Sequence, residues 1–81
     1  MKSYLVVWFS SDGGNPSEIT RTLVSLGFKP LTGNYDYVYD WGDSSVGVDD
    51  VLSLADKVKT SLQGMGALFK IETVDMNYDT Y

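Results

Sequence analysis

The side chains that could do chemistry begin in the segment SSDGG, which covers residues 10–14. Ser10 and Ser11 are potential nucleophiles, but a serine needs an adjacent base, commonly histidine, before it can attack a substrate. The chain contains no His and no Cys. A serine–histidine or cysteine–histidine nucleophile and a zinc site of the usual kind are therefore excluded. Asp12 remains as a candidate ligand for a divalent metal.

A second group of carboxylates lies farther along the chain, at Asp43, Asp49 and Asp50. Carboxylate oxygens are ligands that calcium prefers, but calcium loops follow the pattern D-x-[DN]-x-[DN]-G. The spacing of these three residues does not follow that pattern. We interpret them as a solvated turn and the first turn of a helix.

Gly13 and Gly14 stand just before a predicted helix, where backbone N–H groups can bind an anion. The segment is neither G-x-G-x-x-G nor a Walker loop. The carboxylates of Asp12 and Glu18 would also oppose an anion. We interpret the segment as a tight turn that leads into a capped helix.

The composition indicates one small acidic domain. Eighty-one residues leave room for a single domain, predicted over residues 1–75 with a C-terminal tail at 76–81. Hydrophobic residues make up 43% and charged residues 21%, as in soluble globular chains. The net charge of −5 creates a field that repels a phosphate backbone, so we expect no nucleic-acid partner. We expect no cofactor either.

The sequence also favours a cytoplasmic protein. The absence of Cys excludes a disulfide framework of the kind found in small secreted domains. The first apolar run, residues 4–9, is too short to span a membrane and lacks the cleavage pattern of a signal peptide. We therefore expect no contact with a membrane.

The first half of the chain predicts a buried strand and a helix. Residues 3–10 are apolar at both alternating sets of positions, which is typical of a central strand covered on both faces. Asn15 is a candidate N-cap that forms a capping box with Glu18, and Pro16 suits the first helical position. The helix has a buried stripe and ends at Gly27 in a Schellman motif, with a contact between two apolar residues. The stripe is Ile19, Leu23 and Leu26, and the contact joins Leu23 to Phe28.

The rest of the chain predicts three strands and a second helix. Residues 28–32 form an edge strand, because Pro30 lacks an N–H group, and Gly33-Asn34 is a turn signal. An aromatic strand follows at about 35–41. The second helix covers about 48–63, with Leu52 and Leu54 widening a stripe of Val51, Ala55, Val58 and Leu62. Residues 67–74 alternate as a half-exposed strand does.

This order resembles the ferredoxin-like split βαβ fold, β-α-β-β-α-β. The resemblance implies an α+β domain with a four-stranded antiparallel sheet, strand order 4-1-3-2 and both helices on one face. The first and third predicted strands are the most apolar and aromatic, as central strands should be. An alternative reads residues 28–41 as one long bent strand, which would give βαβαβ with a mixed sheet.

Helices on one face leave the other face of the sheet open. If Leu5, Val7 and Phe9 meet the helices, the open face holds Tyr4, Val6 and Trp8. The third strand offers two arrangements. In the favoured one its aromatic residues form the core layer, and two aspartates lie on the open face; in the other, Val38 alone is core and the aromatics share the open face. The aromatics are Tyr35, Tyr37, Tyr39 and Trp41, and the aspartates are Asp36 and Asp40.

Two further resemblances involve short segments. YDYV, residues 35–38, resembles part of the third-strand motif of RNA-recognition domains, in which alternate aromatics stack on bases. No Lys or Arg precedes it, and Asp36 and Asp40 would repel phosphates. The position of Asp12 after the first strand resembles that of the metal-binding aspartate in small CRISPR-associated dimeric nucleases. That resemblance implies a divalent-metal-dependent nuclease with Asp12 as metal ligand.

An exposed apolar patch usually marks an interface. We therefore expect a non-enzymatic interaction module that self-associates as a homodimer or binds another protein through the open face. The predicted interface residues are Tyr4, Val6 and Trp8, with Tyr78 of the tail as a possible cover. The nuclease is the alternative.

Overall fold

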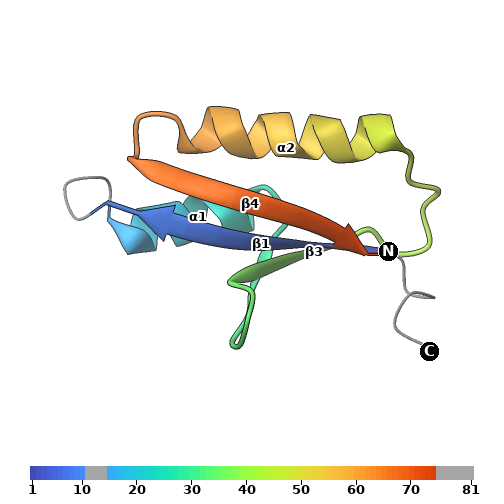
Figure 1. The fold of residues 1–81 in the computed structure, drawn as a ribbon, viewed down its shortest axis with the longest axis horizontal. Helices are drawn as coiled ribbons and strands as arrows, with labels where there is room; N and C mark the ends of the chain where they lie inside the picture. Colours follow the sequence, from blue (N-terminus) through green and yellow to red (C-terminus); the bar gives the residue numbers. More distant parts are fainter. Residues whose placement is uncertain (11–14, 75–81) are drawn as a thin grey trace.

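The described part of the chain folds into four strands and two helices (Figure 1). The computed structural model describes residues 1–10 and 15–74. Along the chain the elements are β1 (Lys2–Phe9), α1 (Pro16–Ser25), β2 (Lys29–Pro30), β3 (Tyr37–Asp40), α2 (Val48–Leu62) and β4 (Ala67–Val74). The predicted α+β class, with a four-stranded antiparallel sheet and two helices, is confirmed.

One antiparallel sheet contains all four strands in the spatial order β2-β3-β1-β4. β1 and β3 are the central strands. β4 pairs with β1 from Lys2↔Val74 to Phe9↔Ala67 without interruption. β2 pairs with β3 over two residues only. Because β2 and β3 are separate antiparallel strands, the alternative of one bent strand over residues 28–41 is wrong.

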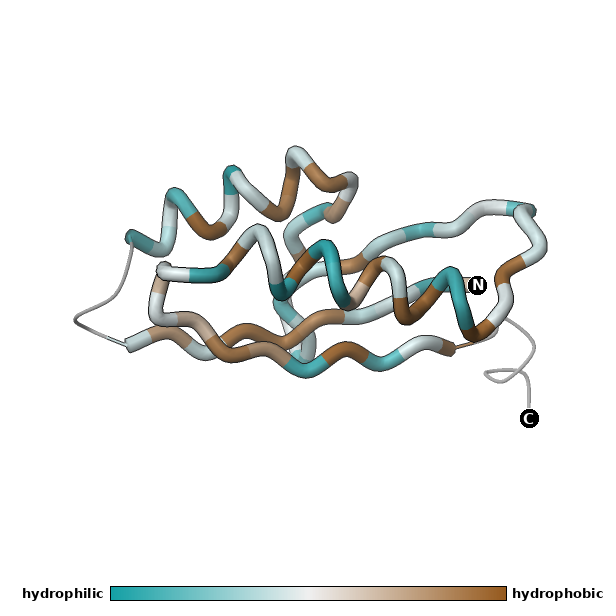
Figure 2. Tube along the Cα trace, turned by 90° about the horizontal axis from the view of Figure 1, so that it is seen from above, coloured by the Kyte–Doolittle hydropathy of each residue, from teal (hydrophilic) through white to brown (hydrophobic). Residues whose placement is uncertain are grey.

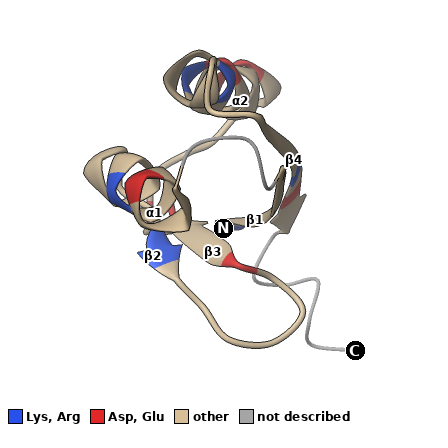
Figure 3. Ribbon diagram, turned by 90° about the vertical axis from the view of Figure 1, so that its left-hand side faces the viewer, with Lys and Arg blue, Asp and Glu red and all other residues tan. Residues whose placement is uncertain are grey.

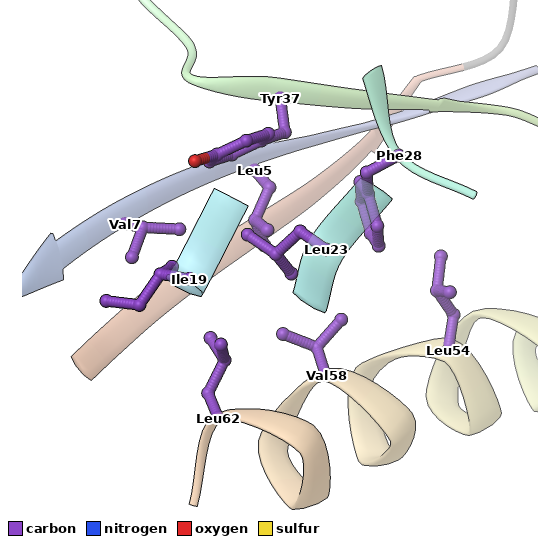
Figure 4. Close-up of a cluster of buried hydrophobic side chains, with 9 residues drawn as sticks. All are labelled: Leu5, Val7, Ile19, Leu23, Phe28, Tyr37, Leu54, Val58 and Leu62. Carbon is purple, nitrogen blue, oxygen red and sulfur yellow. The ribbon is translucent and has the colours of Figure 1, made fainter. Parts of the chain in front are cut away.

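Both helices pack on the same face of the curved sheet (Figure 3). On β1 the buried side chains alternate with exposed or half-buried ones, which is the pattern of a strand with one face in the core. Figure 4 shows the buried cluster, to which both helices and the central strands contribute. Its members are Leu5, Val7, Ile19, Leu23, Phe28, Tyr37, Leu54, Val58 and Leu62.

α1 begins and ends as its sequence predicts, with one exception. Asn15 is the N-cap and Pro16 the first helical residue, but the Asn15 side chain makes no capping hydrogen bond. The predicted capping box with Glu18 is therefore wrong. The Schellman motif is confirmed, since the N–H groups of Gly27 and Phe28 donate to the carbonyls of Val24 (3.0 Å) and Leu23 (3.1 Å).

Gly27 is required at this turn for two reasons. Its φ of +108° is a conformation that residues with a side chain rarely adopt. A Cβ atom there would also lie 2.9 Å from the ring of Tyr39. The turn thus brings the backbone against an aromatic ring and directs Phe28 into the core, where it is buried.

α2 begins after Gly47, whose N–H group donates to the Asp50 carboxylate at 2.8 Å. The buried stripe predicted from the sequence includes Val51 and Ala55, but both side chains are only half-buried. Leu52 is 56% exposed, so its predicted place on the buried face is wrong. The buried stripe consists of Leu54, Val58 and Leu62.

Three of the four aromatics of the 35–41 segment face the helices. Tyr37 is buried, and Tyr39 and Trp41 are packed against the core. Tyr39 makes edge-to-face contacts with Phe28 (centroids 5.4 Å apart) and Trp41 (4.8 Å). The favoured arrangement, with these aromatics as a core layer, is confirmed for these three rings.

Two side chains depart from the predicted burial pattern. Tyr35 precedes β3, and its ring packs on Tyr4 instead of the core (centroids 4.8 Å apart). The alternation ends because the chain bends at Asp36, before the first residue of β3. Phe9 is 49% exposed and lies outside the buried cluster, although it lines a groove with Pro16 and Thr20 of α1. Val7 is the last core residue of β1.

Polar groups on the core side of the sheet are paired. Ser3 is fully buried; its hydroxyl accepts a hydrogen bond from Trp41 Nε1 (2.8 Å) and shares another with Thr73 (2.7 Å). The Tyr37 hydroxyl bonds to Thr20 of α1 at 2.6 Å. Such pairing offsets the cost of removing these groups from water.

Neither helix in the described part of the chain combines the length and the hydrophobicity needed to cross a membrane.

Candidate functional site

The register of the sheet places the three predicted interface residues on the face away from the helices. Ser3, Leu5 and Val7 are buried on the core side. Tyr4 and Val6 alternate with them and are half-buried, while Trp8 is exposed. We call this side of the sheet the open face.

The open face has an apolar end. Trp8 lies directly opposite Leu68 in the β1–β4 ladder, and their side chains are 55% and 73% exposed. Val6 precedes them on β1 and contributes apolar surface to the same end. Hydrophobic residues are concentrated in this half of the sheet, where β1 ends and β4 begins (Figure 2). An exposed tryptophan thus lies beside an exposed leucine on this face.

The middle of the open face is occupied by a pair of tyrosines. The Tyr35 ring packs on Tyr4, and the Tyr35 hydroxyl donates a hydrogen bond to Glu72 of β4 at 2.5 Å. This hydrogen bond to a carboxylate raises the pKa of the Tyr35 hydroxyl above its ordinary value, because ionisation would remove the proton that Glu72 accepts. The contact connects the segment before β3 to β4 across β1.

The other end of the open face carries charges of both signs. Lys2 lies opposite Asp40 on β3 and opposite Val74 on β4, whereas Lys70 lies opposite Val6, next to the apolar end. Asp40 is therefore on the open face, as expected. The exposed apolar side chains of this face lie at the Trp8–Leu68 end, the tyrosine pair lies in the middle, and charges of both signs lie at the far end.

Asp36 has a structural role that its charge did not suggest. Its side-chain oxygen accepts a hydrogen bond from the Val7 N–H at 2.9 Å, and its own N–H donates to the Leu5 carbonyl. β3 begins only at Tyr37, so the carboxylate replaces the strand partner that Val7 would otherwise lack. Asp36 thus completes the hydrogen bonding of β1 beside Val7, where β3 does not reach.

Several predicted residues lie outside the described part of the chain. They include Asp12, the candidate metal ligand, the Gly13-Gly14 turn, and Tyr78 of the tail. Within residues 1–10 and 15–74, no group of three or more acidic side chains is arranged to hold a metal ion. The nuclease alternative therefore stays a hypothesis that depends on Asp12.

A groove with a cavity volume of about 850 Å³ lies between the C-terminal part of α2 and the start of β4. Asp56, Lys59 and Thr60 line it from α2, and Leu68 and Phe69 line it from β4. It adds surface beside the apolar end of the open face.

Sequence reasoning found one partner of the apolar pair and missed the other. Trp8 is visible because it alternates with the buried residues of β1. Leu68 shares its side of β4 with Lys70 and Glu72, so its segment predicts a mostly polar face. The contact of Tyr35 with Tyr4 and Glu72 was also missed, and only the bend at Asp36 could have indicated it.

Comparison with protein-family models, with curated proteins and with solved structures gives no match.

Proposed function

We propose that this chain is a small acidic, non-enzymatic interaction module that binds protein through the open face of its sheet. The observation that carries the proposal is the adjacent exposure of Trp8 and Leu68. Tryptophan is enriched at the energetic centres of protein interfaces, because a large ring can be desolvated there at little entropic cost. A second copy of the chain and another protein are both suitable partners.

The surroundings of the apolar pair support the same proposal. Lys70 and Glu72 on β4 and Lys2 and Asp40 at the far end give the open face a polar border of both signs. Apolar residues bordered by polar ones are the usual composition of a protein-binding surface. The net charge of −5 makes a nucleic acid a poor partner for it.

We also propose that the architecture is the ferredoxin-like split βαβ fold and that the protein acts in the cytoplasm. The order of elements along the chain and the spatial order β2-β3-β1-β4 support the fold proposal. The absence of Cys supports the cytoplasmic proposal, since small exported domains often depend on disulfides.

Trp8 provides a direct test of the first proposal. In a Trp41→Phe background Trp8 is the only tryptophan, so its emission reports on the open face alone. If a second copy covers the face, the emission should shift to the blue as protein concentration rises, and Trp8→Asp should reduce the sedimentation coefficient at high concentration.

Another protein as partner requires a second measurement. A photo-crosslinking amino acid at position 8 or 68, in the cells of origin, should give a discrete adduct. The same group at Lys57, exposed on α2, serves as the matched control and should not. An emission unchanged by concentration, together with no adduct specific to positions 8 and 68, would show the proposal to be wrong.

A further inference from the structure

Among the strands of the described residues, β4 is an edge strand, and the hydrogen bonds of the sheet show which of its backbone groups point outward. The Val7 N–H and the Leu5 carbonyl both bond to Asp36, so odd-numbered residues of β1 direct their backbone groups toward β3. Even-numbered residues of β1 then face β4, because backbone direction alternates along a strand.

The same alternation applies to β4. Directly opposite residues of an antiparallel pair share the same hydrogen-bonding direction, and Val6 lies opposite Lys70. The even-numbered residues of β4 therefore bond to β1. The N–H and C=O groups of Phe69, Ile71 and Thr73 point away from the sheet. Within residues 1–10 and 15–74 no strand pairs with these groups, so they form a regular edge that is a template for another strand.

We propose that this edge pairs with the β4 edge of a second copy, antiparallel and with the twofold axis at Ile71. Ile71 then lies opposite Ile71 of the second copy, and Phe69 opposite Thr73. Three directly opposite pairs each exchange two backbone hydrogen bonds, about six in total. The two sheets become one sheet of eight strands.

Charge selects this register. With the axis at Ile71, Lys70 of each copy lies opposite Glu72 of the other, on the open face and in the closely spaced type of pair. Both side chains are exposed in the single chain. A shift of the axis to residue 70 would place lysine opposite lysine, and a shift to residue 72 would place glutamate opposite glutamate. Backbone groups that point outward can pair only with outward-pointing groups of the other copy. The axis can therefore move only in whole-residue steps, and residues 70 and 72 are the nearest alternatives.

The core side of β4 suits the same pairing. Phe69 and Ile71 pack against the core but remain only partly buried at the edge. A second β4 strand would cover both side chains with its own Thr73 and Ile71. The groove beside Phe69, between α2 and β4, leaves space along this flank.

This edge is distinct from the open face, so the inference does not depend on the proposed function. The pairing would, however, place the two open faces on the same side of one continuous sheet. Each Trp8–Leu68 pair would remain exposed there, and a partner could contact two copies at once.

Charge reversal tests the register directly. Lys70→Glu and Glu72→Lys should each raise the dimer dissociation constant at least about tenfold, since each variant places like charges opposite one another twice. A one-to-one mixture of the two variants should form a heterodimer, because the acidic side chains of K70E then face the basic side chains of E72K. Analytical ultracentrifugation measures the association of each variant alone and of the mixture, and circular dichroism verifies that both variants fold.

Matched controls separate this outcome from general electrostatics. Lys57→Glu and Asp49→Lys make the same charge changes on α2, where both residues are exposed, and neither should alter the wild-type dimer. Trp8→Asp should leave the β4 dimer intact, so loss of open-face binding and loss of edge pairing are distinguishable. A wild-type protein that stays monomeric at its highest accessible concentration, or a K70E/E72K mixture that fails to associate, would overturn the inference.

Discussion

The two edges of the sheet are built in opposite ways. β2 contributes two residues, Lys29 and Pro30, to one edge. β4 contributes eight consecutive residues to the other edge, all paired with β1 on their inner side. One edge strand of the sheet is thus too short to pair with another strand, whereas the other edge strand is long enough.

The difference has a local cause. Pro30 lacks an N–H group, which restricts it to an edge position, and the chain turns soon afterwards at Gly33, with φ of +111°. The Leu31 N–H donates to the Asp36 carbonyl at 2.8 Å and closes this turn. β4 has no proline or glycine, and its charges occur on one face only. Short, proline-containing edges are a common protection against unwanted pairing, and β4 lacks that protection.

The largest expected effect concerns Gly27, which positions β2 after α1. Gly27→Ala should reduce the free energy of unfolding by about 3 kcal/mol, from an unfavourable φ and from a clash with the Tyr39 ring. Gly33→Ala is the matched control, because its φ is nearly the same but no atom lies within 4 Å of the added Cβ. It should cost only about 1 kcal/mol. Urea unfolding measures both, and equal losses would contradict the role of the ring contact.

A smaller effect is expected at Asp36, whose side chain accepts a backbone hydrogen bond from β1 on the side that faces β3. Asp36→Ala leaves the Val7 N–H without an acceptor and should cost about 1 kcal/mol. Hydrogen exchange of the Val7 amide should become faster. Asp36→Asn keeps an acceptor oxygen and should retain most of the stability. If the Val7 amide exchanges equally fast in wild type and Asp36→Ala, the hydrogen bond does not protect it.

Much of the fold follows from local patterns in the sequence. β1 was predicted because both of its alternating sets are apolar, and the end of α1 because Gly27 stands between Leu23 and Phe28. Departures from the predicted burial occur where a pattern continues beyond the structure that it describes. Phe9 continues the alternation of β1 past the last core residue, and Tyr35 continues the alternation of β3 past the bend at Asp36.

The candidate site was less predictable, because it depends on register. The sequence indicates that Trp8 faces away from the helices, but not which residue of another strand lies beside it. The Trp8–Leu68 pair and the outward direction of the Ile71 backbone both follow from how β1 and β4 align. Register of this kind is a property of the folded sheet and is not encoded in either strand alone.

The smallest expected effect concerns the hydrogen bond that connects the segment before β3 to β4 across the open face. The Tyr35 hydroxyl precedes β3 and donates to Glu72 on β4, and this hydrogen bond raises the pKa of Tyr35. Because the folded pKa lies above the unfolded one, the contact stabilises the fold below the unfolded pKa. The stabilisation is lost in alkaline solution as pH rises through the folded pKa. Glu72→Gln removes the carboxylate and should return the pKa of Tyr35 toward its ordinary value.

NMR of the labelled Tyr35 ring carbon beside the oxygen follows this titration, with Tyr35→Phe to assign the signal. An unchanged Tyr35 titration in Glu72→Gln would mean that the carboxylate is not the cause of the raised pKa. The same measurement also bears on the β4 edge. In a β4 dimer, Lys70 of the second copy would lie beside Glu72 and partly neutralise it. The pKa of Tyr35 should therefore be higher in dilute, monomeric protein than in concentrated protein, whereas an edge as inert as that of β2 would leave it independent of concentration.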